Sequence, residues 1–314
     1  VYVLSTDLDR ALTSAQSFLI GMFPPTGNFV WNGGLNWQPI PVHAFGPGVP
    51  NQLLKPTSTA CPIYDKLAEE INGGLYKQML NNNTQLVRFL RNNAGIPKSK
   101  GLLRDLIRLN DINREIAHNL AQPDWVNKVW EEYGGNTTLQ IITEWKRRHR
   151  WSQFEDMRLA RLRGGYLLGD FLTRAKNVVE NKKNETADMR LYSSHDGTLS
   201  AFLAAMNASD LQLIPYSSCI IMEIVEDNGE HYVKMLFRKN GQVHNLFVPG
   251  CKENRCLFST FHEALSPNAI FDKETLDKEC GNPILSDHTK SSNDNKNMLT
   301  VFIVCLISLF SFSI

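Results

Sequence analysis

The stretch that decides the fold is residues 189–206, MRLYSSHDGTLSAFLAAM. Its short apolar start, with Leu191 and Tyr192, is typical of a buried strand, and its later apolar residues return at helical spacing. A strand, a polar turn and a helix in this order predict a turn at the carboxyl end of a strand. Open α/β sheets keep their ligand sites at that edge. His195 and Asp196, which lie in the turn, are therefore candidate functional residues.

His195 and Asp196 admit two interpretations. The free N–H groups at the start of a helix favour an anion, and a histidine beside a carboxylate can bind a phosphate and transfer a proton. In the alternative, Asp196 is an ordinary N-cap residue in a surface turn. The dipeptide alone fits both, so the rest of the chain has to decide between them.

The chain begins with a second strand–turn–helix pattern. Residues 1–5 (VYVLS) are typical of a strand, and 5–10 (STDLDR) supply turn and capping residues. Residues 11–23 carry apolar residues at helical spacing, and Pro24 and Pro25 end the helix. Two such units predict strands of one sheet with their turns on one edge, which makes the fold class α/β.

The middle of the chain is helical. Residues 61 to about 182 repeat apolar residues every three or four positions, which predicts a helical subdomain inserted into the α/β domain. One amphipathic run from Thr137 to Val179 contains Gly164 and Gly165, which predict a kink or a close packing contact. The expected parts are an α/β core over 1–60 and 155–285, a helical cap over 61–154, a polar linker over 286–297 and a hydrophobic terminal segment over 298–314.

A β-hairpin is predicted after the His195 unit. Apolar residues alternate in 219–226 and in 231–239, on either side of Asn228 and Gly229. Asn-Gly is a favoured two-residue hairpin turn because both residues tolerate positive φ. Residues 243–250 predict one further strand.

Composition limits the function classes. The chain has 314 residues, of which 42% are hydrophobic, and a net charge of +1, which argues against nucleic acid as a partner. It starts at Val1 inside a predicted strand, without an initiator methionine or a signal peptide, so we expect the true N-terminus to lie upstream. Asn-x-Ser/Thr triplets favour glycosylation in the secretory pathway, and they occur at Asn82, Asn136, Asn184 and Asn207.

The six cysteines fit an oxidising compartment better than a metal site. Cys251 and Cys256 lie close together after Pro249 and Gly250, but the sequence has no second pair of ligands at a spacing that zinc uses. A local disulfide in a lumenal loop is the better interpretation. We expect no metal and no cofactor.

The last segment, 298–314 (MLTVFIVCLISLFSFSI), has no charge and is barely long enough to span a bilayer as a helix. Following the polar residues 286–297, it also fits a glycolipid-anchor signal. A buried core helix is the least favoured of the three alternatives. In the membrane interpretation Cys305 lies in lipid and forms no disulfide.

Several stretches together resemble the histidine acid phosphatases, most closely the members from animals. The resemblance covers nearly all of 1–281. It is carried by VYVLSTDLDRALTSAQSFLIGMFPP, WQPIPVH, ACPIYDKL, RLRGG, LYSSHDGTLSAFLAAM, the hairpin around Asp-Asn-Gly, and PGCKENRC with a later Glu-Cys. It implies a phosphoglycerate-mutase-like α/β sandwich, the histidine-phosphatase core, with a helical cap, which agrees with the layout predicted from periodicity.

The resemblance also implies a chemistry. Family members cleave phosphate monoesters through a covalent phosphohistidine, so Asp196 is expected to protonate the leaving oxygen and His195 to contact the phosphoryl oxygens. The sequence departs from the family in two ways. The Arg-His-Gly motif that carries the nucleophile is absent, and Leu4 stands where a phosphate-binding arginine is expected. We therefore expect the chain as given to be inactive or very weak.

Disulfide pairing is implied by the resemblance as well. It pairs Cys61 with Cys280 and Cys251 with Cys256. The family's partner of Cys219 lies in the helical region, where this chain has no cysteine, so the thiol of Cys219 is expected to be free.

Two functions remain open from the sequence. The first is an acid phosphatase of the secretory pathway, in the lysosome, at the cell surface or secreted. Its partners are a small phosphate monoester and, through 298–314, a membrane, and a homodimer is possible. The second is a catalytically inactive relative that keeps the fold as a binding protein. Leu4 favours the second, and the intact His195 and Asp196 favour the first.

Overall fold

The computed structural model describes residues 1–97, 101–180, 187–253 and 255–283, together with the backbone of 301–306. The chain divides into two compact units, Val1–Ile63 with Asp156–Ile314, and Tyr64–Glu155. The sequence predicts a helical cap over 61–154 and an α/β core over 1–60 and 155–285.

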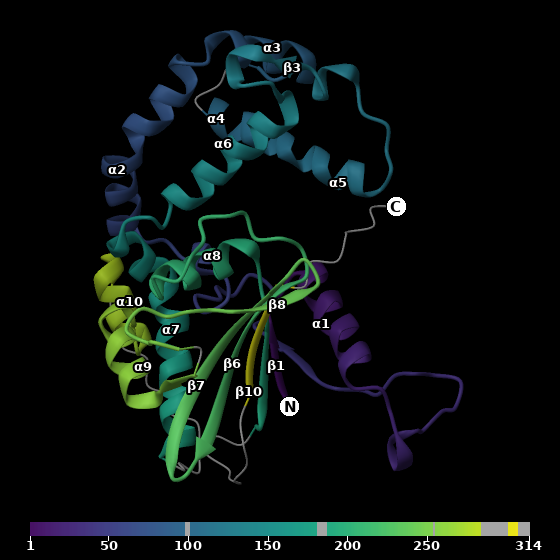
Figure 1. The fold of residues 1–314 in the computed structure, drawn as a ribbon, viewed down its shortest axis with the longest axis vertical. Coiled ribbons are helices and arrows are strands. Elements are labelled where there is room, and N and C mark those ends of the chain that lie inside the picture. The colour runs from purple at the N-terminus through teal and green to yellow at the C-terminus, as the bar shows by residue number, and fades with distance from the viewer. Residues whose placement is uncertain (98–100, 181–186, 254, 284–300, 307–314) are drawn as a thin grey trace. The chain divides into compact units, whose positions relative to one another are not determined.

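The first unit is built on one mixed sheet with the strand order β2-β1-β5-β10-β6-β7-β8, and β9 pairs with β7 (Figure 1). The strands are β1 (Tyr2–Ser5), β2 (Val42–Ala44), β5 (Met189–Ser193), β6 (Ser218–Asp227), β7 (Glu230–Lys239), β8 (Gln242–Asn245), β9 (Arg255–Leu257) and β10 (Val301–Leu306). Neighbouring strands from β2 to β10 are parallel, and β6 pairs antiparallel with both β10 and β7. The predicted hairpin is confirmed, with positive φ at Asn228 and Gly229.

Helices cover both faces of this sheet. The first unit contains α1 (Asp9–Met22), α7 (Met157–Val179), α8 (Asp196–Ala205), α9 (Phe258–Leu265) and α10 (Lys273–Cys280), with short 3-10 turns η1 (Gly27–Phe29), η2 (Pro56–Ser58) and η6 (Ser266–Asn268). On one face, Leu19 of α1 belongs to the same buried cluster as Leu191 of β5. On the other, the ring of Phe171 of α7 lies 5.9 Å from that of Tyr192 and 4.8 Å from that of Phe202 of α8. Since Leu191 and Tyr192 are successive strand residues, their side chains point to opposite faces.

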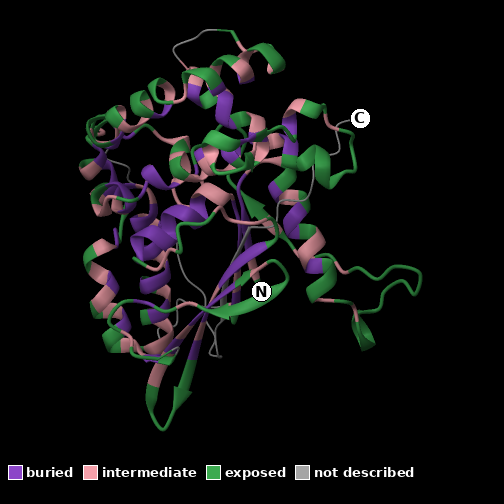
Figure 2. Cartoon of the chain, turned by 45° about the horizontal axis from the view of Figure 1, so that its top comes forward, coloured by how far each residue is buried: buried purple, intermediate pink, exposed green. Residues whose placement is uncertain are grey.

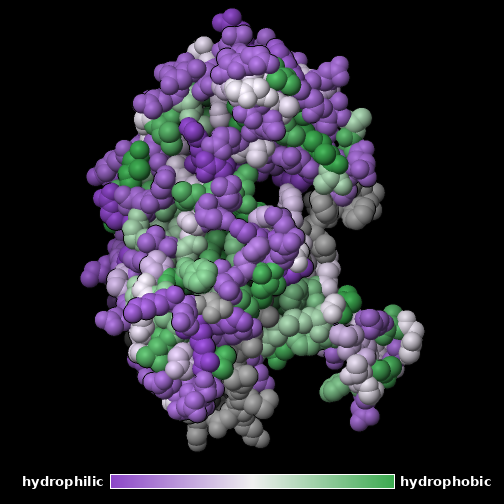
Figure 3. All heavy atoms as spheres, viewed as in Figure 1, coloured by the Kyte–Doolittle hydropathy of each residue, from purple (hydrophilic) through white to green (hydrophobic). Residues whose placement is uncertain are grey.

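Burial follows these layers. Figure 2 shows the buried residues concentrated in the strands and in the helices packed on them. The arm between α1 and β2 is different, because its apolar side chains face water (Figure 3). Its most exposed apolar residues are Phe29, Val30, Trp31, Leu35 and Trp37. The Trp31 indole N–H donates to the carbonyl oxygen of Trp37 (3.0 Å), so the arm has a local contact of its own.

The second unit is a helical bundle with a small two-stranded ribbon. Its elements are α2 (Pro62–Asn81), α3 (Thr84–Ala94), α4 (Leu102–Arg108), α5 (Ile112–Ala117), α6 (Thr138–Ser152), β3 (Val129–Trp130) and β4 (Asn136–Thr137), with the 3-10 turns η3 (Leu109–Asp111), η4 (Asp124–Val126) and η5 (Glu131–Tyr133). Its core includes Leu86, Leu90, Leu106 and Ile142, all fully buried. Both α2 and the helical block begin close to the cysteine at 61, as periodicity predicts.

One predicted amphipathic run proves to be two helices. The sequence predicts continuity from Thr137 to Val179, but α6 ends at Ser152 and α7 begins at Met157. The carboxylate of Asp156 accepts a hydrogen bond from the N–H of Arg158 (2.8 Å) and so caps α7. A side chain that satisfies a free helix N–H favours a start at that point, and it separates the helices within one apolar pattern.

The terminal segment also differs from its prediction. Residues Val301–Leu306 form β10, an inner strand between β5 and β6, whereas a membrane helix or anchor was expected over 298–314. Among the described residues, none of the helices combines the length and the apolar character that crossing a bilayer requires. A continuous apolar run suits a strand inside a parallel sheet as well as a helix in lipid, and periodicity does not separate the two. The other residues of 298–314, and the linker 286–297, lie outside the described ranges.

The cysteines that the structure describes are disulfide-bonded, and the strand order explains the state of Cys219. The structure contains the disulfides Cys61–Cys280 (S–S 2.05 Å) and Cys251–Cys256 (2.07 Å). Cys219 is disulfide-bonded too, so the prediction of a free thiol is wrong. That prediction placed the family's partner of Cys219 in the helical region, where this chain has no cysteine, but the antiparallel register of β10 and β6 places residue 305 opposite 219.

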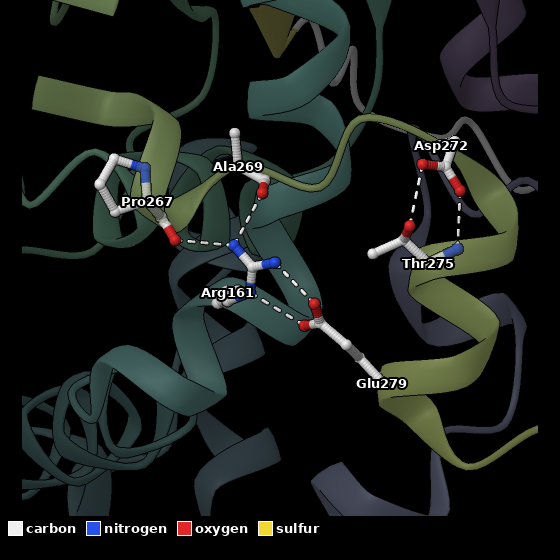
Figure 4. Close-up of polar contacts among 6 residues, drawn as sticks. All are labelled: Arg161, Pro267, Ala269, Asp272, Thr275 and Glu279. Carbon is white, nitrogen blue, oxygen red and sulfur yellow. Dashed lines mark hydrogen bonds and ion pairs between the residues drawn. The ribbon is translucent and has the colours of Figure 1, made fainter. Parts of the chain in front are cut away.

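An arginine on α7 ties three segments of the first unit together (Figure 4). The guanidinium of Arg161 donates to both carboxylate oxygens of Glu279 on α10 (2.9 and 2.6 Å). It also donates to the carbonyl oxygens of Pro267 and Ala269 (2.7 Å each) in and beyond η6. Because the planar fork of arginine meets all these acceptors at once, it fixes α10 and the loop before it against α7.

Glycines on α7 allow close packing, as the sequence predicted. A Cβ at Gly164 would lie 2.0 Å from the carbonyl oxygen of Ala201 on α8 and 3.0 Å from the Cβ of Ala205. A Cβ at Gly169 would lie 2.0 Å from the carbonyl oxygen of Ile270. Both distances are far inside van der Waals contact, so any side chain at these positions would push α8 or the η6 loop away from α7.

We expect Gly164→Ala to lower the free energy of unfolding by about 1–3 kcal/mol or more, because an added methyl in a filled interface forces backbone shifts. Urea denaturation measures this loss. Gly21→Ala on α1 is the matched control, since nothing lies within 4 Å of a Cβ there, and alanine favours helix by up to about 1 kcal/mol. Equal stabilities of the two variants would contradict the packing role of Gly164.

Deletion of residues 298–314 distinguishes an inner strand from an anchor. Loss of β10 leaves backbone groups of β5 and β6 without partners, so we expect Tm to fall by more than about 5 °C. A chain that ends at Leu306 keeps β10 and serves as the control, with an unchanged Tm. If both chains melt at the temperature of the full chain, the segment is not a structural strand.

Candidate active site

Two turns meet at the carboxyl end of the parallel strands. Ser193 ends β5, and Ser194 and His195 lie between it and the start of α8 at Asp196. On the neighbouring strand β1, Thr6 follows the last strand residue, and its N–H donates to the carbonyl oxygen of Ser193 (3.1 Å). The two strand–turn–helix units predicted from the sequence are therefore adjacent, with their turns side by side.

A third segment fixes the His195 turn. The carbonyl oxygen of Leu54 accepts hydrogen bonds from the hydroxyls of Ser194 (2.6 Å) and Thr198 (2.7 Å). All three residues are buried, and buried hydrogen bonds are costly to break because no water replaces them. Since Ser194 and Thr198 flank His195 and Asp196, these bonds hold both ends of the candidate site.

The imidazole of His195 is held in its neutral form by its surroundings. Its Nε2 lies 3.0 Å from the hydroxyl oxygen of Thr6. Burial lowers the pKa of His195 to about 4, helped by the positive charge of Arg10 and opposed by Asp196, with a further lowering by Lys55. A neutral imidazole has one N–H donor and one acceptor, so it can hydrogen-bond a phosphoryl oxygen without a formal charge.

Two helices begin at this edge. His195 is the N-cap residue of α8 and Leu8 that of α1, and neither uses its side chain to cap its helix. The first N–H groups of both helices are thus left to other partners, and the helix dipoles add positive potential. An edge of this kind favours an anion.

The three residues that the sequence singles out, His195, Asp196 and Leu4, lie in different surroundings. His195 lies in the turn at the strand end, and Asp196 is the first residue of α8. Leu4 lies within β1, opposite Tyr192 in the parallel register, and only 6% of it is exposed. A leucine there contributes to packing and offers no hydrogen bond to an anion.

Sequence reasoning missed three residues of this site, Thr6, Arg10 and Lys55. Thr6 and Arg10 belong to the first strand–turn–helix unit, so the inference that two such turns share one edge was a sufficient signal for them. Lys55 follows Leu54 in an irregular segment. No periodicity or motif marks such a segment, and only the hydrogen bonds of Leu54 bring it to the turn.

The described part of the chain contains no cluster of side chains suited to bind a metal ion. No group of three or more His, Cys, Asp or Glu side chains there is placed to hold a metal ion. The residues described around the turn offer the imidazole of His195, the carboxylate of Asp196 and three hydroxyls, and the charges of Arg10 and Lys55 act on the imidazole.

Comparisons with known proteins agree with this geometry. The model of the histidine phosphatase superfamily (branch 2) matches residues 1–238. The chain is 32% identical to prostatic acid phosphatase from Rattus norvegicus over 271 residues, which are 85% of this chain and 68% of the relative. It is 32% identical to lysosomal acid phosphatase from Xenopus laevis, covering 89% of this chain and 63% of the relative. It is 30% identical to prostatic acid phosphatase from Homo sapiens, covering 94% and 74%.

A solved structure shares the fold. A phytase from Hafnia alvei, in complex with myo-inositol hexakis sulphate, superposes with a TM-score of 0.57 at 14% sequence identity. The match covers 86% of this chain and 79% of the phytase. It confirms the predicted α/β architecture and, at this identity, the fold alone.

We expect an NMR titration of His195 to give a pKa of about 4, against about 6.5 in the unfolded chain. The unfolded state then takes up the proton first, so the free energy of unfolding falls as pH falls from 6.5 to 4. His195→Asn should remove about 3 kcal/mol of that fall, measured by urea denaturation at pH 7 and pH 4.

Asp196→Asn tests the direction in which the carboxylate of Asp196 shifts the pKa of His195. The carboxylate of Asp196 raises the pKa of His195, so its removal should move the titration of His195 to still lower pH. A pKa near 6.5 in the wild-type chain, or an upward shift in Asp196→Asn, would contradict the electrostatics of this site.

Proposed function

This chain belongs to branch 2 of the histidine phosphatase superfamily, and we propose that its His195 site takes part in the hydrolysis of phosphate monoesters. The observation that carries the proposal is the position of His195 and Asp196 at a sheet edge where two helices begin. Helix N-termini favour a phosphate. The relatives named prostatic and lysosomal acid phosphatases support a phosphate monoester as the substrate class.

The two residues have different roles in this proposal. The neutral imidazole of His195 donates a hydrogen bond to a phosphoryl oxygen, and Thr6 at 3.0 Å orients its ring. Asp196 gives a proton to the ester oxygen as the phosphorus–oxygen bond breaks, because an alkoxide is a poor leaving group. Asp196 then takes a proton from the water that hydrolyses the phosphoryl intermediate.

The nucleophile is the missing part of this chemistry. None of the eight histidines is followed by glycine, so the Arg-His-Gly motif that the family resemblance requires does not occur. We propose that residues 1–314 bind the phosphoryl group and supply the acid, and that they do not form a phosphohistidine efficiently by themselves. The buried Leu4 weakens the site further, because it replaces a cation by a side chain without donors.

Leu4 also supports the second candidate, a catalytically inactive binding protein. A strand position that holds a buried leucine keeps the fold and loses one contact to phosphate. The same site then serves to bind a phosphorylated ligand without turning it over.

The glycosylation triplets and the disulfides support a location in the secretory pathway. Asn82, Asn136 and Asn207 are exposed, as glycosylation requires, whereas Asn184 lies outside the described residues. The disulfides are consistent with an oxidising compartment. Attachment to a membrane and assembly into a homodimer stay predictions.

Phosphate release from an aryl phosphate at pH 5 tests the proposal. We expect the chain of residues 1–314 to be at least about a thousandfold slower than rat prostatic acid phosphatase, since loss of a nucleophile typically costs more than this. A chimera that carries the Arg-His-Gly segment of that relative before Val1 should gain turnover. Asp196→Asn in the chimera should then reduce it about a hundredfold or more.

Asp210→Asn in the chimera is the control, because Asp210 is paired with Lys239 on the sheet and has no role in the site. Fast turnover by residues 1–314 alone would show that the nucleophile proposal is wrong. A folded but inactive chimera would favour the binding protein.

A further inference from the structure

Two cationic side chains flank the His195 turn from two different segments. Arg10 lies in the first turn of α1, and Lys55 directly follows Leu54. Both act on the imidazole of His195 through their positive charge and lower its pKa.

Hydrogen bonds of the backbone hold each cation's segment against the turn. The carbonyl oxygen of Ala11, the residue after Arg10, accepts from the hydroxyl of Ser193 (2.8 Å). The carbonyl oxygen of Leu54, the residue before Lys55, accepts from Ser194 and Thr198. The two segments are therefore joined to residues on either side of His195, and their distance from the turn is set by buried contacts.

Neither cation has a carboxylate partner among the described residues. In the ranges that the structure describes, neither Arg10 nor Lys55 forms an ion pair, whereas Arg161 pairs with Glu279 and Lys239 with Asp210. The carboxylates nearest in sequence to the two turns are Asp7, Asp9 and Asp196. Since neither cation is held by a carboxylate in these ranges, both stay available to a bound anion, and the first turns of α1 and α8 add positive potential.

We propose that Arg10 and Lys55 bind the phosphoryl group of the ligand and take over the role that Leu4 cannot fill. Two single positive charges match the charge of a phosphate monoester dianion. Arginine offers a fork of two N–H donors to two oxygens, and lysine a mobile point charge. This assignment rests on the proposed function, because it names the cations of the same site.

The binding of inorganic phosphate to the chain of residues 1–314 tests this assignment. Isothermal titration calorimetry at pH 7 and low salt should show an increase in Kd of about tenfold or more for Arg10→Gln and for Lys55→Gln, the typical cost of a lost charge-assisted hydrogen bond. The double variant should lose about a hundredfold. Lys55→Arg keeps the charge and should stay within a few-fold of the wild-type chain.

Lys278→Gln is the matched control, because Lys278 is exposed on α10 of the same unit. If it weakens binding as much as Lys55→Gln, the effect is general electrostatics and the assignment is wrong. Unchanged Kd in both site variants, with phosphate still bound by the wild-type chain, overturns the assignment and leaves the proposed function standing. A wild-type chain that binds no phosphate overturns both.

The titration of His195 provides a second readout that a purely structural role would not change. Arg10→Gln and Lys55→Gln should each move the titration of His195 to higher pH, because each removes a positive charge that opposes protonation. Inorganic phosphate should also raise it in the wild-type chain and do so less in the variants. Identical titrations in wild type and variants would place both cations away from the ring and overturn the assignment.

Discussion

The parallel pairing of β1 with β5 is the constraint on which the rest of the structure depends. Ser5 lies opposite Ser193, and the hydrogen bond from the Thr6 N–H to the carbonyl oxygen of Ser193 extends the pairing beyond the strands. Both turns and both helix starts therefore fall at one edge. A register shift of one residue would exchange the faces of Leu191 and Tyr192, so the packing of the core and the position of His195 are specified together.

The packing of α8 against α7 sets the position of the site residues on α8. Asp196 opens α8, so its position depends on how closely that helix approaches α7. Gly164 allows the carbonyl oxygen of Ala201 to lie where a side chain would otherwise stand. The fork of Arg161 holds the other contacts of α7 in place (Figure 4). The hydrogen bonds from Ser194 and Thr198 to the carbonyl oxygen of Leu54 lie in the buried layer, where they are difficult to replace.

The sequence predicted those parts of the fold whose signals are local. The unit around His195 and the hairpin at Asn228 are short, and their residues alternate or recur with one period. The break before Met157 was missed because a cap can interrupt an apolar pattern without changing it. The strand Val301–Leu306 was missed because an apolar run has the same composition inside a sheet and inside a membrane. The state of Cys219 was wrong because its partner was sought only in the helical region, whereas β10 brings residue 305 opposite it. Lys55 could not be predicted, since its place is set by contacts more than a hundred residues away in sequence.

The distribution of charge in the site has a physical reason. A cation at position 4 would stand in a strand where only 6% of the present side chain is exposed. Such a charge loses its hydration on folding and needs a ligand or a partner to offset that cost. Arg10 and Lys55 belong to a helix start and an irregular segment at the rim, where water still reaches them. Cations in such places carry a smaller desolvation cost when the site is empty. They can therefore supply positive potential to the turn while the buried strand keeps an apolar residue that stabilises the sheet.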